Sequence, residues 1–152
     1  MSEILYRNAN PSESDIIVGF QLAMALETED IILDKEICTR GVAAVFANEA
    51  LGQYFVAERA GEIIASLMIT YEWSDWRNGM VWWIQSVYVA PEGRQQGVYA
   101  GLYDHVKAIV NADQNLRGIR LYVDERNKRA QEVYTRLGMN GEHYRVFEWM
   151  KS

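Results

Sequence analysis

The sequence predicts an α/β fold of the mixed α+β kind, in which about four helices flank a twisted, mostly antiparallel sheet of six to seven strands. An apolar run from Val81 to Ala90 is followed by a glycine-bearing turn, a helix-periodic stretch and a further strand, so the chain contains a strand–helix–strand unit. The same run is the third of three strand-like segments with short connections, which is typical of an antiparallel meander. Nothing resembling a linker divides the chain, so we expect one domain over residues 1–152.

The composition is that of a globular protein and argues against two function classes. Of the 152 residues, 49% are hydrophobic and 24% are charged, as in a folded domain with a core. The formal net charge of −6 argues against a nucleic-acid partner, which requires a basic face, and is compatible with a cationic small substrate. No apolar run approaches the roughly 20 residues of a membrane span. With Cys38 as the single cysteine and no signal-peptide core, we expect a cytoplasmic protein without a disulfide.

The first 50 residues predict one strand and two helices. Ile4 to Arg7 is a short strand candidate. The stretch from Ser12 to Asp15 offers N-caps for a helix that continues to Glu27. An acidic, loop-like segment from Glu27 to Asp30 follows, and a second helical pattern runs from about Lys35 to Asn48.

A hairpin and the long apolar strand come next. Gln53 to Glu58 and Ile63 to Tyr71 read as two strands, joined by a turn from Arg59 to Glu62. The stretch from Glu72 to Gly79 then connects to the apolar strand, with Asn78-Gly79 as a tight-turn signal because both residues tolerate positive φ.

The end of the apolar strand predicts an anion site. Pro91 ends the strand because proline has no N–H for the ladder. A turn and the segment Arg94 to Tyr99 follow, and a helix is expected from Ala100 to Asn111. This order directs several backbone N–H groups and the positive end of a helix dipole at one place, which suits a phosphate.

The remainder of the chain predicts two strands and a helix. Ile119 to Val123 should run parallel to the apolar strand, since it completes the strand–helix–strand unit. A helix should begin at Asn127 and end with Gly138 as its left-handed cap. An alternating pattern from Tyr144 to Met150 indicates a final strand.

Two segments resemble the motifs of the GNAT N-acetyltransferase superfamily. The loop Arg94-Gln95-Gln96-Gly97-Val98-Tyr99 is similar to the family's pyrophosphate loop, Gln/Arg-x-x-Gly-x-Gly/Ala. Tyr99 departs from that pattern, and its side chain must point away from the phosphates if the backbone is to hold them. The second motif is Asn-x-x-Ala-x-x-x-Tyr-x-x-x-Gly-Phe/Met, which Asn127, Ala130, Tyr134, Gly138 and Met139 match.

The resemblance implies acetyl-CoA as cosubstrate, without a metal. The loop would take the pyrophosphate through backbone N–H groups, and the strand edge at Val87 to Val89 would pair with the amides of the pantetheine arm. The residues that the resemblance assigns to the cofactor are Val87, Tyr88, Val89, Arg94, Gln95, Gln96, Gly97, Val98, Tyr99, Ala100, Asn127, Ala130 and Tyr134.

The resemblance also assigns Tyr134 as the general acid that protonates the departing thiolate. Taken without the motif, Tyr134 would be a core residue of the helix and Asn127 a plain N-cap. The residue that deprotonates the amine is not defined by the sequence. Glu72 and Glu27 are the candidates for the base, and three further acids stay open: Glu29, Asp75 and Glu148.

A weaker resemblance links the chain to the spermidine/spermine acetyltransferase branch, through the aromatic and acidic segment Tyr71 to Trp76. That branch carries a Glu-Asp pair where this chain has Gln85-Ser86, so a polyamine substrate is not favoured. The prediction is an acetyl-CoA-dependent N-acetyltransferase that acts by direct attack of a primary amine of a small molecule or peptide, with a homodimer expected by analogy. The alternatives are O-acetylation, transfer of a longer acyl group, or a non-catalytic acyl-CoA-binding regulatory module.

Overall fold

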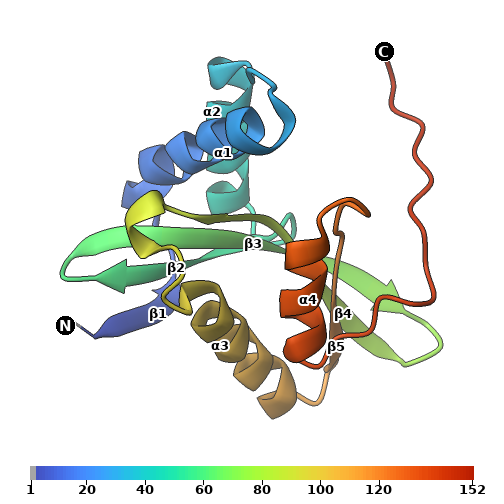
Figure 1. The fold of residues 1–152 in the computed structure, drawn as a ribbon. Helices are drawn as coiled ribbons and strands as arrows, with labels where there is room; N and C mark the ends of the chain where they lie inside the picture. Colours follow the sequence, from blue (N-terminus) through green and yellow to red (C-terminus); the bar gives the residue numbers. More distant parts are fainter. Residues whose placement is uncertain (1–2) are drawn as a thin grey trace. The chain divides into compact units, whose positions relative to one another are not determined.

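The computed structural model describes residues 3–152 and divides the chain into two compact units, one ending at Arg120 and one running from Leu121 to Ser152. The first unit is built on a sheet whose strands follow the order β1-β2-β3-β4-β5 (Figure 1). The strands are β1 (Ile4–Asn8), β2 (Gln53–Arg59), β3 (Glu62–Ser74), β4 (Gly79–Val89) and β5 (Leu116–Leu121).

Helices cover both faces of this sheet, with α1 and α2 on one face and α3 on the other (Figure 1). The helices are η1 (Pro11–Glu13), α1 (Ser14–Glu29), α2 (Lys35–Ala47), η2 (Pro91–Gly93), α3 (Val98–Ala112) and, in the second unit, α4 (Lys128–Arg136). None of the helices in the described chain is long and apolar enough to cross a membrane.

The sheet is mixed, because one of its pairings differs in direction from the others. The pairs β1–β2, β2–β3 and β3–β4 are antiparallel, as the predicted meander requires. At the other edge, the Met80 N–H donates to the Asn115 carbonyl at 2.9 Å, so the first residues of β4 and β5 lie together. Two neighbouring strands that begin at the same end run parallel, which confirms the predicted strand–helix–strand unit.

The core lies on the two faces of the central strands, where alternate side chains pack against the helices above and below. The largest fully buried side chains come from α1, β2, β3, β4 and α3, and they are Ile17, Phe55, Ile64, Leu67, Ile69, Ile84, Leu102 and Val106. The unusually continuous apolar character of β3 and β4 follows from this double coverage.

The predicted count of six to seven strands was wrong, because the described residues contain five. The segment Tyr144–Met150 was predicted as a strand and is not one. Alternating apolar residues form a strand only where a neighbouring strand supplies hydrogen bonds, and the pattern contains no information on that neighbour. The strand β5 also begins earlier than predicted, at Leu116 rather than at Ile119.

Two predicted loops are shorter than expected, which changes the position of two candidate bases. The helix α1 continues through Glu27 and Glu29 and ends at Asp30, which adopts a left-handed conformation with φ 54°. The strand β3 continues through Glu72 to Ser74, which pairs with Gly79 at the start of β4. Glu27 therefore lies on a helix and Glu72 on a strand, rather than in loops.

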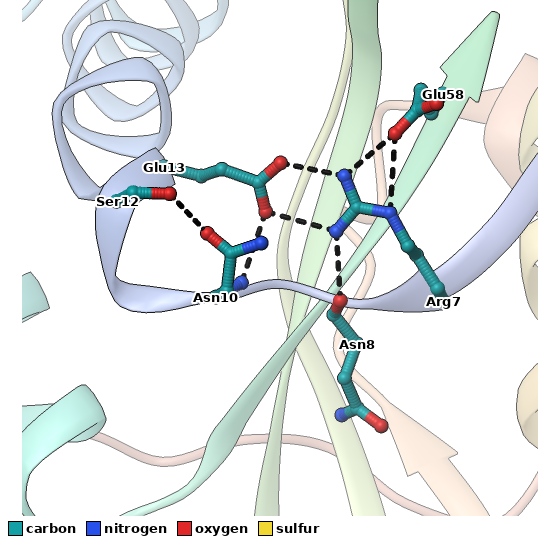
Figure 2. A network of polar contacts seen from close by, with 6 residues as sticks. All are labelled: Arg7, Asn8, Asn10, Ser12, Glu13 and Glu58. Carbon is teal, nitrogen blue, oxygen red and sulfur yellow. Dashed lines mark hydrogen bonds and ion pairs between the residues drawn. The ribbon is translucent and has the colours of Figure 1, made fainter. Parts of the chain in front are cut away.

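A partly buried arginine cluster joins the first two strands to η1, just before α1 (Figure 2). Arg7 donates to both carboxylate oxygens of Glu13 at 3.0 and 2.6 Å, and its Nε and Nη2 donate to Glu58 at 3.2 and 2.7 Å. Glu13 also accepts the Asn10 N–H, which closes a capping box before the helix. The guanidinium of Arg7 lowers the pKa of Glu13 below its ordinary value of 4.5.

We expect Arg7→Met to lower the free energy of unfolding by about 1–3 kcal/mol, because two partly buried carboxylates lose their cation. Urea unfolding at pH 7 measures this loss. The control Arg40→Met removes only an exposed pair with Glu36 and should change stability by less than about 0.5 kcal/mol.

The same substitution predicts a pH dependence. Since folding lowers the pKa of Glu13, its contribution is fully present above the unfolded value of 4.5 and disappears as the pH falls through the folded pKa. The stability difference between the natural protein and Arg7→Met should therefore shrink between pH 5 and pH 3. A difference that stays constant over that range would contradict the assigned cause.

We also expect Ala60→Asn to stabilise the β2–β3 hairpin. Ala60 and Gly61 form its two-residue turn with φ values of 51° and 82°, a conformation that alanine adopts at a cost. Asparagine tolerates it better, so the midpoint of thermal unfolding should rise, by an amount worth about 0.5–1 kcal/mol. The matched control Ala44→Asn in α2 should lower the midpoint, because asparagine is a poorer helix former than alanine.

Candidate functional site

The strand β4 bends where it approaches the predicted cofactor edge. Its register with β3 shifts between the pairs Met68↔Gln85 and Ser66↔Tyr88, and Ser86 adopts a positive φ of 55°. This is a β-bulge, which redirects the strand and increases its local twist. The Gln85 side chain anchors the bulge by donating to the Thr70 hydroxyl on β3 at 2.5 Å.

The residues after the bulge form an open backbone edge. The Ala90 N–H donates to the Ile64 carbonyl on β3 at 2.8 Å, so Ala90 and Tyr88 direct their backbone groups at β3. By alternation, the backbone groups of Val87 and Val89 point to the opposite side. The parallel strand β5 starts beside the start of β4 and has 6 residues against 11, so it ends before β4 does. The last residues of β4 thus direct the backbone groups of Val87 and the Val89 N–H away from β3, while the Val89 carbonyl accepts a hydrogen bond from Arg94 Nε at 2.9 Å.

The loop after β4 has the geometry of an anion cradle. Gln95 and Gly97 adopt left-handed conformations with φ values of 62° and 72°, and α3 begins directly afterwards. The first helical bond runs from the Gly101 N–H to the Gly97 carbonyl, so the N–H groups of Val98 and Ala100 precede the intrahelical ladder. A Cβ added at Gly97 would meet no atom within 4 Å, which leaves room for a ligand there. These donors and this space fit a pyrophosphate.

Tyr99 lies in the first turn of α3. Its ring packs against that of Tyr103, with the centroids 6.4 Å apart.

Arg94 is tied to the end of α1. Its Nη2 forms an ion pair with Glu27 at 2.6 Å, and its Nε donates to the Val89 carbonyl at 2.9 Å. The hydroxyl of Tyr88 donates to the other oxygen of Glu27 at 2.6 Å. These bonds, that from Tyr88 first and that from Arg94 second, lower the pKa of Glu27, whereas burial raises the pKa of Tyr88. The cluster joins α1, the end of β4 and the loop.

Arg59 also contacts the loop between β4 and α3, and it is not among the residues predicted from the sequence. It lies at the end of β2, and its Nη2 donates to the Glu92 carbonyl at 3.1 Å while its Nη1 donates to the Gln96 side chain. The Gln96 amide also donates to the Glu92 carbonyl at 2.9 Å. Only the turn between β2 and β3 brings this residue beside a loop that lies more than 30 positions later, so no local pattern could have identified it.

The second predicted base, Glu72, lies away from this site. It pairs with Val81 near the start of β4, whereas Ser66 pairs with Tyr88 at the end. These two positions on β3 are six residues apart, which corresponds to about 20 Å along the strand. Glu72 also forms an ion pair with Arg120 on β5. The structure therefore does not bring Glu72 and Glu27 together.

The second motif is well formed within its own unit. The Asn127 side chain accepts the Ala130 N–H at 3.0 Å and caps α4, as predicted. Gly138, with φ 91°, ends the helix, and the Met139 N–H donates to the Tyr134 carbonyl at 3.0 Å. Burial raises the pKa of the Tyr134 hydroxyl above its ordinary value of 10.0. Tyr134 therefore keeps its proton at neutral pH.

Comparison with known proteins agrees with these motifs. Residues 21–139 match the family model described as "Acetyltransferase (GNAT) family". The chain is similar to the crystal structure of a possible acetyltransferase from Clostridium difficile 630, with 40% identity, 98% of each chain covered and a TM-score of 0.92. A search of curated protein sequences gives no match.

Two more distant structures share the fold. One is a predicted acetyltransferase with acetyl-CoA from Clostridium acetobutylicum, with 22% identity, 99% of this chain and 96% of that chain covered, and a TM-score of 0.73. The other is an aminoglycoside N-acetyltransferase in complex with CoA, with 18% identity, 99% and 96% covered, and a TM-score of 0.77.

The assigned causes of the Glu27 pKa can be tested directly. We expect Tyr88→Phe and Arg94→Gln each to raise this pKa, because each removes a hydrogen bond that favours the ionised carboxylate, and Arg94→Gln also removes a positive charge. Carboxyl titration by NMR measures both variants. Asp124, whose pKa of about 2 depends on Arg126, serves as the internal reference and should not move. A Glu27 pKa that is unchanged in either variant would contradict the cause assigned to that residue.

Proposed function

We propose that this chain, which belongs to the GNAT acetyltransferase family, transfers an acetyl group from acetyl-CoA to a primary amine of a small molecule or peptide. The observation that carries the proposal is the combination of an open backbone edge at the end of β4 with the cradle at Gly97. A long, thin ligand with amides in its middle and a pyrophosphate at one end requires both features, in that order along the chain.

The residues of the first unit fit the cofactor without a metal. The backbone of Val87 and Val89 would pair with the pantetheine amides, and the N–H groups at the start of α3 would bind the pyrophosphate. Acetyl-CoA, when bound, supplies an acetyl group activated as a thioester. The neighbouring structures named with acetyl-CoA or CoA support this choice of cosubstrate.

We propose Tyr134 as the general acid. A group in that role must hold its proton at the working pH and release it to the leaving sulfur. Burial raises the pKa of Tyr134, which keeps its hydroxyl protonated and therefore suits the role. The position of Tyr134 in the second motif, one helical turn after Ala130 on the capped helix α4, agrees with the resemblance to the family.

Neither candidate base is well suited to deprotonating the amine. The lowered pKa of Glu27 makes its carboxylate a weaker base, and both of its oxygens are already bound. Glu72 lies about 20 Å along the sheet from the cofactor edge. We therefore propose that Glu27 positions the loop through Arg94, and that another group or water takes the proton.

The acceptor is proposed to be cationic. The net charge of −6 attracts positively charged amines and raises their local concentration. Similarity to an aminoglycoside N-acetyltransferase makes polyamino sugars a reasonable first class to test, followed by polyamines and amino acids.

Thermal unfolding with acetyl-CoA tests the proposal first. We expect the midpoint to rise, by an amount worth about 2.7 kcal/mol when the ligand is at a hundredfold excess over Kd, because acetyl-CoA binds only the native state. Free-thiol release then identifies the acceptor amine. No shift at millimolar acetyl-CoA would exclude the proposed cosubstrate, and a shift without any turnover would favour a non-catalytic CoA-binding module.

Once an acceptor is known, Tyr134→Phe tests the assigned acid. We expect kcat to fall by about 100-fold or more, since proton transfer by a positioned group contributes that much, while KM for acetyl-CoA changes little. Tyr144→Phe is the matched control, because Tyr144 is 83% exposed and lies outside both motifs. A kcat within threefold of the natural protein would remove Tyr134 from this role.

A further inference from the structure

Two arginines contact the loop between β4 and α3 (the cofactor loop), and their guanidinium groups have different partners. Arg94 belongs to the loop itself, and its guanidinium forms an ion pair with Glu27 at 2.6 Å. Arg59 comes from β2 and contacts only neutral groups of the loop, the Glu92 carbonyl and the Gln96 side-chain oxygen. Among the ion pairs of residues 3–152, Arg59 takes part in none.

Alternation along β2 directs the neighbouring side chains of Glu58 and Arg59 to opposite faces of the sheet. The register shift opposite them places the extra residue, Ile64, on β3, so β2 itself stays regular up to the turn. Glu58 is bound by Arg7 at 2.7 Å, whereas Arg59 contacts the loop after β4. The two adjacent charges therefore have separate partners on the two faces of the sheet.

The chemistry of the two partners favours exchange at Arg59 and not at Arg94. A phosphate oxygen carries a negative charge, so its attraction to the Arg59 guanidinium includes a Coulomb energy that a neutral carbonyl or amide oxygen does not supply. A phosphate that replaces a carbonyl or an amide oxygen at Arg59 therefore gains energy, and no carboxylate must be displaced. A phosphate at Arg94 would have to compete with Glu27, which already holds both Arg94 and Tyr88.

We propose that Arg59 binds a phosphate group of the cofactor and supplies the positive charge of the loop, while Arg94 positions the loop against α1. This inference rests on the proposed function and assigns the charged contact to a residue outside the sequence motif. The planar guanidinium of arginine suits a phosphate because it donates two parallel hydrogen bonds. Arg59 also places a positive charge beside the loop, in a protein whose net charge of −6 would otherwise repel an anion.

Isothermal titration with a series of ligands tests this role without any acceptor. The probes are CoA, dephospho-CoA, which lacks the 3′-phosphate, and pantetheine, which lacks all phosphates. We expect Arg59→Gln to weaken CoA binding about tenfold and to leave pantetheine binding unchanged, and we expect the salt dependence of the CoA Kd to become shallower. Arg59→Lys, which keeps the charge and loses the fork, should recover part of the CoA affinity.

The dephospho-CoA measurement identifies the phosphate. If Arg59→Gln weakens CoA and dephospho-CoA equally, the contact is to the pyrophosphate. If it weakens CoA alone, the contact is to the 3′-phosphate. Arg40→Gln makes the same change of charge on the exposed face of α2, and it should leave all three affinities as they are.

Two outcomes would overturn the inference. Equal CoA affinity in Arg59→Gln and the natural protein would show that the charge is not used. Weaker CoA binding in Arg59→Gln with an unchanged salt dependence would show that Arg59 only supports the loop. Failure of the proposed function is distinguishable from both, because the natural protein itself would then bind none of the three probes. Arg59→Lys keeps the test decisive should Arg59→Gln fail to fold.

Discussion

The path of β4 is the constraint on which the candidate site depends. The strand is held by its ladder with β3 until the bulge at Ser86, where the register shifts by one residue. Past that point the strand β5 no longer pairs with it, because β5 has 6 residues against 11. Exposed amide groups in the middle of a sheet are rare, since unpaired backbone groups cost free energy unless water or a ligand satisfies them. The edge at Val87 and Val89 is thus both a structural exception and the place where an extended ligand can add.

Charged side chains form a second set of contacts that hold the loop between β4 and α3. Glu27, at the last turn of α1, is bound by Arg94 and Tyr88 and so links the helix to the loop. Arg59, at the end of β2, donates to the Glu92 carbonyl. Arg94 is paired with a carboxylate and Arg59 is not, and the proposed positioning role of Arg94 and binding role of Arg59 rest on this difference. The motif itself contains only the first of them.

The sequence predicted those parts of the fold that depend on local chemistry. The cap at Asn127, the left-handed Gly138 and the turn at Ala60-Gly61 were all identified from residue type and spacing, because each satisfies a backbone requirement within a few residues. The final strand was predicted wrongly, since its pattern contained no information about a pairing partner. Glu72 was assigned to a loop because the extension of β3 depends on its partners in β4.

By itself, the sequence determined the order of elements, the cradle after the apolar strand and the family to which the chain belongs, because glycine, proline and apolar periodicity act over short distances. Only the tertiary structure decided which charged side chains pair with one another and which of them lie beside the loop. It placed Arg59 beside the loop, tied Glu27 to Arg94 and separated Glu72 from the cofactor edge. The two contacts join residues that are 33 and 67 positions apart, and charge interactions depend on distances in space that spacing along the chain does not specify.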